Sequence, residues 1–208
     1  MSYFIILFVL IHVGYSIDYT SCEYPTSNTQ RVEWMENLVI ITQKILTINN
    51  IPSWIVQGTL LGAHRDKKIL EWTSDTDIQI YKHHISTICN NLSFQFKVHN
   101  ITIYECTSDY LRICYANVSL VSPKLITNFS PDARLDVYGS VLRSDGLYDV
   151  TFSRCKWNFT ELYPLTRYVL KNNKSFIGPN NAVPWLVTAY GKDWKYPKYY
   201  SGNVDDKC

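Results

Sequence analysis

Hydrophobic residues recur along the chain first at helical spacing and then at strand spacing. Between residues 31 and 49 apolar side chains follow a helical period, which ends at Asn49, Asn50 and Pro52. Apolar, aromatic or β-branched runs then follow, and several of them alternate between apolar and polar positions as strands do: residues 53–57, 78–81, 98–105, 111–121 and 134–138. The pattern therefore predicts a long amphipathic helix ahead of a strand-rich region, which is an α+β arrangement.

Turn-forming residues divide the remaining segments. The triplet at 144–146, Ser-Asp-Gly, predicts a hairpin over residues 141–152. Residues 86–92 are apolar at helical spacing, and residues 168–170 predict a short strand. A last helix is expected to start at Pro184 and to end at Gly191, since proline suits the first turn and glycine the end of a helix.

The first residues have the pattern of a secretory signal. Residues 3–13 are apolar except for His12, and the small residues Gly14 and Ser16 predict cleavage after Ser16. The run is shorter than the ~20 residues that a spanning helix needs. We therefore expect a signal peptide at residues 1–16 and no stable membrane span after its cleavage. A retained signal-anchor is the alternative.

Sequons and cysteines agree with a secretory destination. The sequence has an even number of cysteines, six, with no C-x-x-C pair and no Cys/His quartet at zinc spacing, so disulfides are favoured over a zinc site and their pairing stays open. N-x-S/T sequons occur at Asn91, Asn100, Asn117, Asn128, Asn158 and Asn173. The sequon at Asn128 is a poor acceptor, because Pro131 follows it. These features place the protein in the ER or Golgi lumen or outside the cell.

Length and charge limit the class further. The mature chain is long enough for one domain with a real core. Its formal net charge of +2 is nearly balanced and no basic block is present. The charge therefore disfavours a nucleic acid as the main partner.

The stretch from residue 57 to residue 81 combines a glycine-containing turn with two acidic residues. Gly58 and Gly62 bracket the turn, and Asp75 and Asp77 lie two positions apart just before an alternating run. Glycine lacks the Cβ that would keep backbone N–H groups away from a phosphate. Carboxylates at i and i+2 of an extended segment share one face, where they can hold a hard cation. The combination indicates metal-assisted phosphoryl or nucleotidyl chemistry.

Other residues add to this set. Thr59 offers a hydroxyl and Arg65 a bidentate guanidinium to the same phosphate. Asp136, in the middle of the strand predicted at 134–138, adds a third carboxylate that a neighbouring strand could bring beside Asp75 and Asp77. The ordinary alternatives are acids that face water and glycines that form a plain strand-to-helix turn.

Residues 58–81, GTLLGAHRDKKILEWTSDTDIQIY, resemble the core motif of the LicD family, which includes the fukutin and fukutin-related proteins. Later segments, RLDVYG, LYPL, FIGPN and AYGKDWKYP, are similar to downstream landmarks of that family. The resemblance extends over approximately residues 31–197. It divides the chain into a signal peptide (1–16), a lead-in segment (17–30), a LicD-like transferase domain (31–200) and a tail (201–208).

The resemblance implies a fold, an activity and a site. The fold is a nucleotidyltransferase-like mixed sheet flanked by helices in a single domain. The activity is the transfer of a phospho-alcohol, of the phosphocholine or ribitol phosphate type, from a CDP-activated donor to a glycan or glycoprotein acceptor. The resemblance implies that three carboxylates bind Mg²⁺ or Mn²⁺ and are also the catalytic residues: Asp75, Asp77 and Asp136. It implies that four residues of the first motif bind the donor: Gly58, Thr59, Gly62 and Arg65.

One departure from the family pattern bears on catalysis. Members commonly have a proline before the tryptophan and further aspartates directly after it, whereas Glu71 precedes Trp72 here and Thr73 and Ser74 follow it. Fewer carboxylates weaken cation binding. The alternative function is therefore a catalytically inactive secreted protein that keeps the fold as a glycan- or nucleotide-binding module. A structural secreted domain without a ligand leaves the first motif unexplained.

Overall fold

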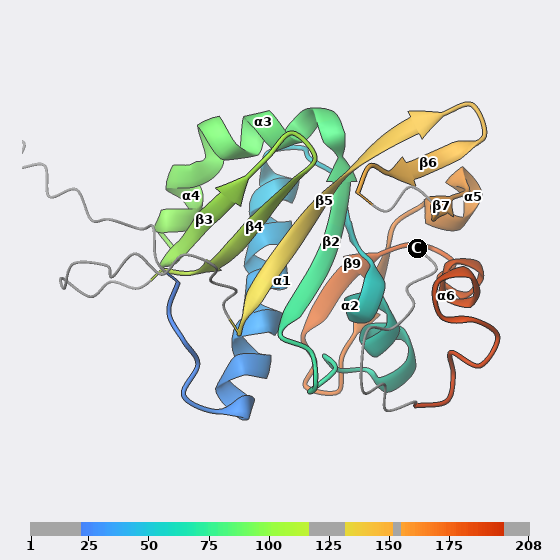
Figure 1. The fold of residues 1–208 in the computed structure, drawn as a ribbon, viewed down its shortest axis with the longest axis horizontal. Helices are drawn as coiled ribbons and strands as arrows, with labels where there is room; N and C mark the ends of the chain where they lie inside the picture. The colour runs from blue at the N-terminus through green and yellow to red at the C-terminus, as the bar shows by residue number, and fades with distance from the viewer. Residues whose placement is uncertain (1–21, 117–131, 152–154, 198–208) are drawn as a thin grey trace, which may run out of the picture.

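The computed structural model describes residues 22–116, 132–151 and 155–197, and Figure 1 shows their arrangement. A seven-stranded mixed sheet has the order β1-β2-β5-β4-β3, with β6 and β7 extending it from β5. A separate two-stranded sheet contains β8 and β9. The strands are β1 (Ser53–Ile55), β2 (Asp75–Tyr81), β3 (Ile101–Cys106), β4 (Tyr110–Tyr115), β5 (Arg134–Arg143), β6 (Gly146–Asp149), β7 (Lys156–Trp157), β8 (Thr166–Val169) and β9 (Ser175–Gly178).

Helices flank this sheet on more than one side. Figure 1 shows α1 behind the sheet, and α2 and α6 on the side of β2 away from β3 and β4. The helical elements are α1 (Asn28–Ile48), α2 (Gln57–Leu61), the π-helical turn η1 (Gly62–Asp66), the succession η2 (Lys82–His84), α3 (Ile85–Thr87), η3 (Ile88–Leu92) and α4 (Ser93–Lys97), and α5 (Phe159–Leu162) and α6 (Val183–Tyr190). The α+β class and the mixed sheet with flanking helices are thus confirmed.

Helix α1 starts earlier than the apolar period predicts, because Ser27 caps it. The Ser27 side chain accepts a hydrogen bond from the backbone N–H of Gln30 at 3.1 Å, which satisfies one of the free donors of the first turn. The helix ends one residue before Asn49, as its sequence predicts. Its buried side chains pack on β2 and β5 and join the main hydrophobic core, among them Met35, Leu38, Val39, Ile45 and Leu46.

Other elements follow their sequence patterns closely. The turn at Gly146 joins β5 and β6 as an antiparallel hairpin, with Arg143 paired to Gly146. The last helix ends before Gly191, whose φ of 82° lies in the left-handed region that favours glycine. Strand β2 is longer than predicted and begins at Asp75, since it pairs with β5 along its whole length.

A buried glutamine connects four strands of the large sheet. The Gln79 Oε1 atom accepts hydrogen bonds from the indole N–H groups of Trp54 (2.9 Å) and Trp157 (3.0 Å), and its Nε2 donates to Asp149 (2.7 Å). All four residues are buried. Because β1, β2, β6 and β7 each supply one of these groups, the network fixes the edge of the sheet next to β2.

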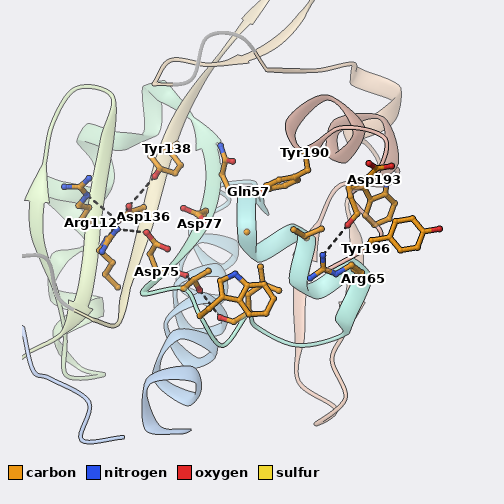
Figure 2. Close-up of a pocket in the computed structure, with 17 residues that line it drawn as sticks. Gln57, Arg65, Asp75, Asp77, Arg112, Asp136, Tyr138, Tyr190, Asp193 and Tyr196 are labelled. Carbon is orange, nitrogen blue, oxygen red and sulfur yellow. Dashed lines mark hydrogen bonds and ion pairs between the residues drawn. The ribbon is translucent and has the colours of Figure 1, made fainter. Parts of the chain in front are cut away.

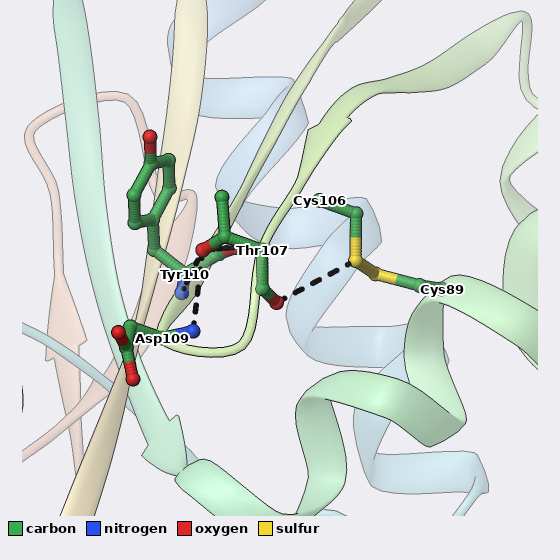
Figure 3. The surroundings of a disulfide bond; sticks show 5 residues. All are labelled: Cys89, Cys106, Thr107, Asp109 and Tyr110. Atoms are coloured by element: carbon green, nitrogen blue, oxygen red, sulfur yellow. Dashed lines mark hydrogen bonds between the residues drawn. A yellow bond between two sulfur atoms is a disulfide. The ribbon is translucent and has the colours of Figure 1, made fainter.

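Disulfides tie the outer elements to this frame. Cys22 pairs with Cys114 of β4, and Cys89 pairs with Cys106, which joins η3 to the end of β3 beside the turn at Thr107 (Figure 3). Cys155 is also disulfide-bonded, and Cys208 lies outside the described residues. The expectation that the cysteines pair as disulfides is confirmed for these residues.

Several sequence predictions fall on parts of the chain that the structure does not describe. They are the signal peptide and its cleavage after Ser16, the sequons at Asn117 and Asn128, and the tail at 201–208. The sequon asparagines within the described ranges all lie on the surface, at positions 91, 100, 158 and 173. No helix in residues 22–116, 132–151 or 155–197 is long and apolar enough to cross a membrane.

We predict that Gln79→Leu lowers the free energy of unfolding by about 3 kcal/mol or more, because it leaves two indole donors and one carboxylate buried without their partner. Chemical denaturation of the variant against the wild type measures this loss. Gln95→Leu is the matched control, since Gln95 is only partly buried and bonds to Asn49. Equal losses for the two variants would contradict the role of the network.

Candidate functional site

The parallel pairing of β2 with β5 brings the acidic residues of the two motifs together. In this register Asp75 is opposite Arg134, and Asp77 is opposite Asp136. Side chains two positions apart on a strand share a face, so all of them project to one side of the sheet. The carboxylates line a cavity of about 430 Å³ (Figure 2). The predicted proximity of the three carboxylates is therefore what the structure shows.

The opposite wall of the cavity comes from the first motif and from the end of the chain's last described helix. Gln57, Gly58 and Leu61 of α2 and Arg65 of η1 line it from one direction. The end of α6 and the segment after it line the cavity from a second direction, through Tyr190, Asp193, Trp194 and Tyr196. Figure 2 shows Arg65, Asp193 and Tyr196 across the cavity from Asp75 and Asp136.

Thr59 lies beneath the acidic wall and does not line the cavity. Its hydroxyl accepts a hydrogen bond from the backbone N–H of Asp77 at 2.7 Å, and its side chain is buried. This bond joins α2 to β2 and fixes the position of Asp77 relative to the glycine turn. The sequence predicts Thr59 as a phosphate ligand. In this structure its hydroxyl instead supports a neighbouring carboxylate, that of Asp77.

The two glycines of the turn have different surroundings. A Cβ on Gly58 would meet its nearest neighbours, side-chain atoms of Leu70 and Thr73, at 3.9 Å, and Gly58 lines the cavity. A Cβ on Gly62 would lie 2.5 Å from the backbone oxygen of Lys68. Gly62 is therefore required by close packing of the chain, whereas a methyl group at Gly58 would make only ordinary van der Waals contacts.

Arg65 reaches the cavity but already has protein partners. Its guanidinium forms a bidentate pair with Asp66, at 2.8 and 2.7 Å, and Nη1 donates to the backbone oxygen of Trp194 at 3.3 Å. These contacts hold the guanidinium plane in a fixed orientation. They also connect η1 to the segment after α6, so the first motif and the aromatic wall of the cavity are one unit.

Arginine side chains neutralise the acidic wall. Arg134 donates to Asp75 through Nη2, and its Nε lies 3.3 Å from Asp136. Arg112 of β4 places its Nε 3.4 Å from Asp136 and also bonds to Glu105 at 2.8 Å. Like-charged carboxylates on adjoining strands repel one another, and the guanidinium groups offset that repulsion.

Burial controls the acid–base properties of the central carboxylate. Burial raises the pKa of the Asp136 carboxyl, and Arg134 and Arg112 oppose part of that rise. The pKa of the Tyr138 hydroxyl is also raised, by burial first and then by the nearby aspartates, so it stays protonated. That hydroxyl donates a hydrogen bond to Asp136 at 3.3 Å. Asp136 is thus shielded from water, and both arginines and Tyr138 hold its carboxylate in position.

The carboxylates in this conformation do not form a metal site. Across the described ranges, no three His, Cys, Asp or Glu side chains are grouped closely enough to hold an ion. The guanidinium of Arg134 lies between Asp75 and Asp136 and bonds to both. The oxygen ligands themselves are of the type that Mg²⁺ and Mn²⁺ prefer. The three carboxylates are therefore suitable ligands for such an ion, but their side chains are not arranged around one position.

Sequence reasoning did not identify Gln57 or the wall formed by residues 190–196 as parts of the site. The segment AYGKDWKYP was recognised only as a landmark, yet its aromatic density was a usable signal of a ligand-facing surface. Gln57 had no signal of its own, because only the folded backbone shows that its side chain faces the cavity.

The domain is an α+β fold with an acidic cavity at one face of its mixed sheet. A family model described as LicD/FKTN/FKRP, nucleotidyltransferase domain, matches residues 50–181. The chain belongs to this family. Its members are generally phospho-alcohol transferases that depend on a divalent metal.

Among curated proteins, the chain is 28% identical over 166 residues to an uncharacterized protein of Rickettsia typhi, covering 77% of this chain and 46% of that protein. It is 27% identical over 161 residues to an uncharacterized protein of Rickettsia prowazekii, covering 77% of this chain and 55% of the other. The chain thus spans about half the length of these relatives.

Solved structures of the antibiotic-resistance factor ANT(2″)-Ia are also similar. A solution structure has 11% identity and a TM-score of 0.46, covering 71% of this chain and 66% of that one. A crystal structure in complex with adenylyl-2″-tobramycin has 11% identity and a TM-score of 0.44, covering 70% of this chain and 68% of that one.

We predict that alanine destabilises the protein at Gly62 but not at Gly58. Gly62→Ala should lower the free energy of unfolding by about 1–3 kcal/mol, because the new methyl group overlaps the backbone at Lys68. Gly58→Ala should fold with a thermal midpoint close to that of the wild type. Thermal unfolding followed by circular dichroism tests both, and a marked loss of stability in Gly58→Ala would show that a methyl group does not fit there.

Proposed function

We propose that this protein is a metal-dependent transferase of the secretory pathway. It moves a phospho-alcohol, of the phosphocholine or ribitol phosphate type, from a CDP-activated donor to a glycan or glycoprotein acceptor. The single observation that carries this proposal is the cavity in which Asp75, Asp77 and Asp136 face the glycine turn of the family motif. The disulfides support a lumenal or extracellular location, since such bonds persist in oxidising compartments.

The glycine turn and Arg65 would bind the donor. Gly58 lines the cavity without a side chain, which lets a phosphate approach the backbone, and Arg65 presents a guanidinium whose orientation Asp66 has already fixed. We assign supporting positions to Thr59, which fixes Asp77, and to Gly62, which lets the turn pack on Lys68. Binding of the diphosphate in this way places the transferable phosphorus between the turn and the acidic wall.

Asp136 would accept the proton of the attacking hydroxyl. In the reaction, the acceptor oxygen forms a bond to the phosphorus of the phospho-alcohol, the bond from that phosphorus to CMP breaks, and CMP leaves. The acceptor hydroxyl loses its proton in this step, and a carboxylate whose pKa is raised by burial takes it up more readily than an exposed one. Tyr138 orients the Asp136 carboxylate through its hydrogen bond.

Asp75, Asp77 and Asp136 would hold the Mg²⁺ or Mn²⁺ ion. Their described arrangement does not do so, and Arg134 must release Asp75 and Asp136 before the oxygens can converge. When bound, the ion neutralises the negative charge of the donor diphosphate. Arg134, once released, remains on β5 beside the cavity.

We expect CDP-choline, CDP-ribitol or CDP-glycerol to stabilise the purified protein in the presence of Mg²⁺. A ligand at a hundredfold excess over its dissociation constant adds about 2.7 kcal/mol to the free energy of unfolding. A thermal-shift screen of these compounds and of CDP, each with Mg²⁺ and with EDTA, measures the effect. Asp77→Asn should remove the part of the shift that depends on metal.

The controls separate this proposal from the inactive alternative. Metal-dependent release of CMP from a donor, above the level of Asp77→Asn, supports catalysis. Donor binding without any turnover in the presence of glycan acceptors would instead identify a nucleotide-binding module. Absence of any shift with all four ligands would refute the proposal.

We predict that Arg134→Gln binds Mn²⁺ about tenfold more tightly than the wild type, because the ion no longer competes with a guanidinium for Asp75 and Asp136. Titration of free Mn²⁺ by electron paramagnetic resonance reports the affinity directly. Arg143→Gln is the matched control, since Arg143 lies on the same strand but packs over Tyr148 in the exposed hairpin. Equal or weaker Mn²⁺ binding by Arg134→Gln would contradict the competition.

A further inference from the structure

The backbone of Gln57 is held in an unfavourable conformation. Its φ is 50°, in the left-handed region that non-glycine residues rarely adopt because the Cβ atom crowds the backbone there. Gln57 follows β1 and begins α2, directly before Gly58, which does not have a positive φ. The strained position of this turn is thus occupied by glutamine, although glycine would adopt it freely.

The side chain of Gln57 adds a second cost. The residue is only 8% exposed, and its Oε1 atom is buried with no hydrogen-bond partner in the described part of the chain. A buried acceptor that lacks a partner destabilises the folded state, because it has lost its hydrogen bonds to water. Glycine at position 57 would remove both costs, so folding alone does not account for this residue.

The side chain lies at the cavity with the acidic residues. Figure 2 shows Gln57 between Tyr138 and Tyr190, with Asp77 close by. The Tyr138 hydroxyl donates its proton to Asp136 and not to Gln57. A molecule that enters the cavity can supply the donor that the Gln57 oxygen lacks.

We infer that Gln57 is a ligand-binding residue that accepts a hydrogen bond from a hydroxyl group of the CDP-alcohol. A phosphate oxygen cannot serve, because it is itself an acceptor. The hydroxyl belongs to the ribose of the cytidine or to the sugar alcohol carried by the donor. This inference rests on the proposed function, and it adds a determinant of which donor is preferred.

Two substitutions separate ligand binding from a structural role. Gln57→Gly removes the carboxamide and relieves the backbone, whereas Gln57→Asn keeps a carboxamide that is one methylene shorter on a residue that tolerates positive φ better. Asn50→Gly is the matched control, since Asn50 has a φ of 57° at an exposed turn that does not line this cavity. We expect all three variants to unfold at or above the wild-type temperature.

Isothermal titration with CDP, CDP-choline and CDP-ribitol then tests the inference. We expect both Gln57 variants to bind at least one of these ligands about tenfold or more weakly than the wild type and Asn50→Gly do. Weaker binding of all three ligands identifies the ribose as the source of the hydroxyl, and weaker binding of CDP-ribitol alone identifies the alcohol.

Two results would overturn the inference by itself: wild-type affinity of the Gln57 variants for every ligand, or a lower unfolding temperature of Gln57→Gly, which would reveal a packing role. If the wild type binds none of the three ligands, the proposed function fails and the inference falls with it. Wild-type binding therefore decides the first proposal, and the difference between the variants decides the second.

Discussion

The parallel register between β2 and β5 is the constraint on which the rest of the site depends. It places Asp77 directly opposite Asp136, and Asp75 opposite Arg134, on a face that the hydrogen bonds of the sheet fix. A shift by one residue would turn these side chains to the other face. The register is secured from both sides, by the pairing of β4 with β5 and by the Gln79 network beside β1. The contacts that stabilise the sheet beside β2 therefore also hold the acidic side chains of the site in position.

The site concentrates negative charge and then compensates for it with the chain's own cations. Arg134 bridges Asp75 and Asp136, and Arg112 shares Asp136 with a second carboxylate, Glu105. Asp136 is the buried carboxylate of this set, and an ion pair there is stable only where the Coulomb attraction offsets the cost of removing its charge from water. An incoming divalent ion would therefore exchange with a guanidinium that already neutralises the carboxylates. The net gain from metal binding is smaller than it would be at an unpaired carboxylate set.

Local patterns predicted the elements well, and tertiary geometry decided the roles of single residues. The helical period over 31–49, the turn at Gly146 and the end of the last helix at Gly191 are encoded by neighbours in sequence, and the structure confirms them. The common location of Asp75, Asp77 and Asp136 also followed from strand alternation. In contrast, the hydroxyl of Thr59 reaches the backbone of Asp77, eighteen positions away, and Arg134 pairs with an acid fifty-nine positions away. Periodicity carries no information about such partners, so neither contact was foreseen.

Thr73, where members of the family commonly have an aspartate, places a hydroxyl and not a charge beside Asp75. The Thr73 hydroxyl lies 3.0 Å from the backbone oxygen of Leu70 and 3.1 Å from that of Asp75, so it donates within the loop that leads into β2. An ionised aspartate at position 73 could not donate this bond, and it would add a negative charge next to Asp75. With threonine there, a single arginine is enough to bridge Asp75 and Asp136. The hydrogen bonds of Thr73 thus hold the loop before β2. The register of β2 and β5 holds the carboxylates of Asp75, Asp77 and Asp136.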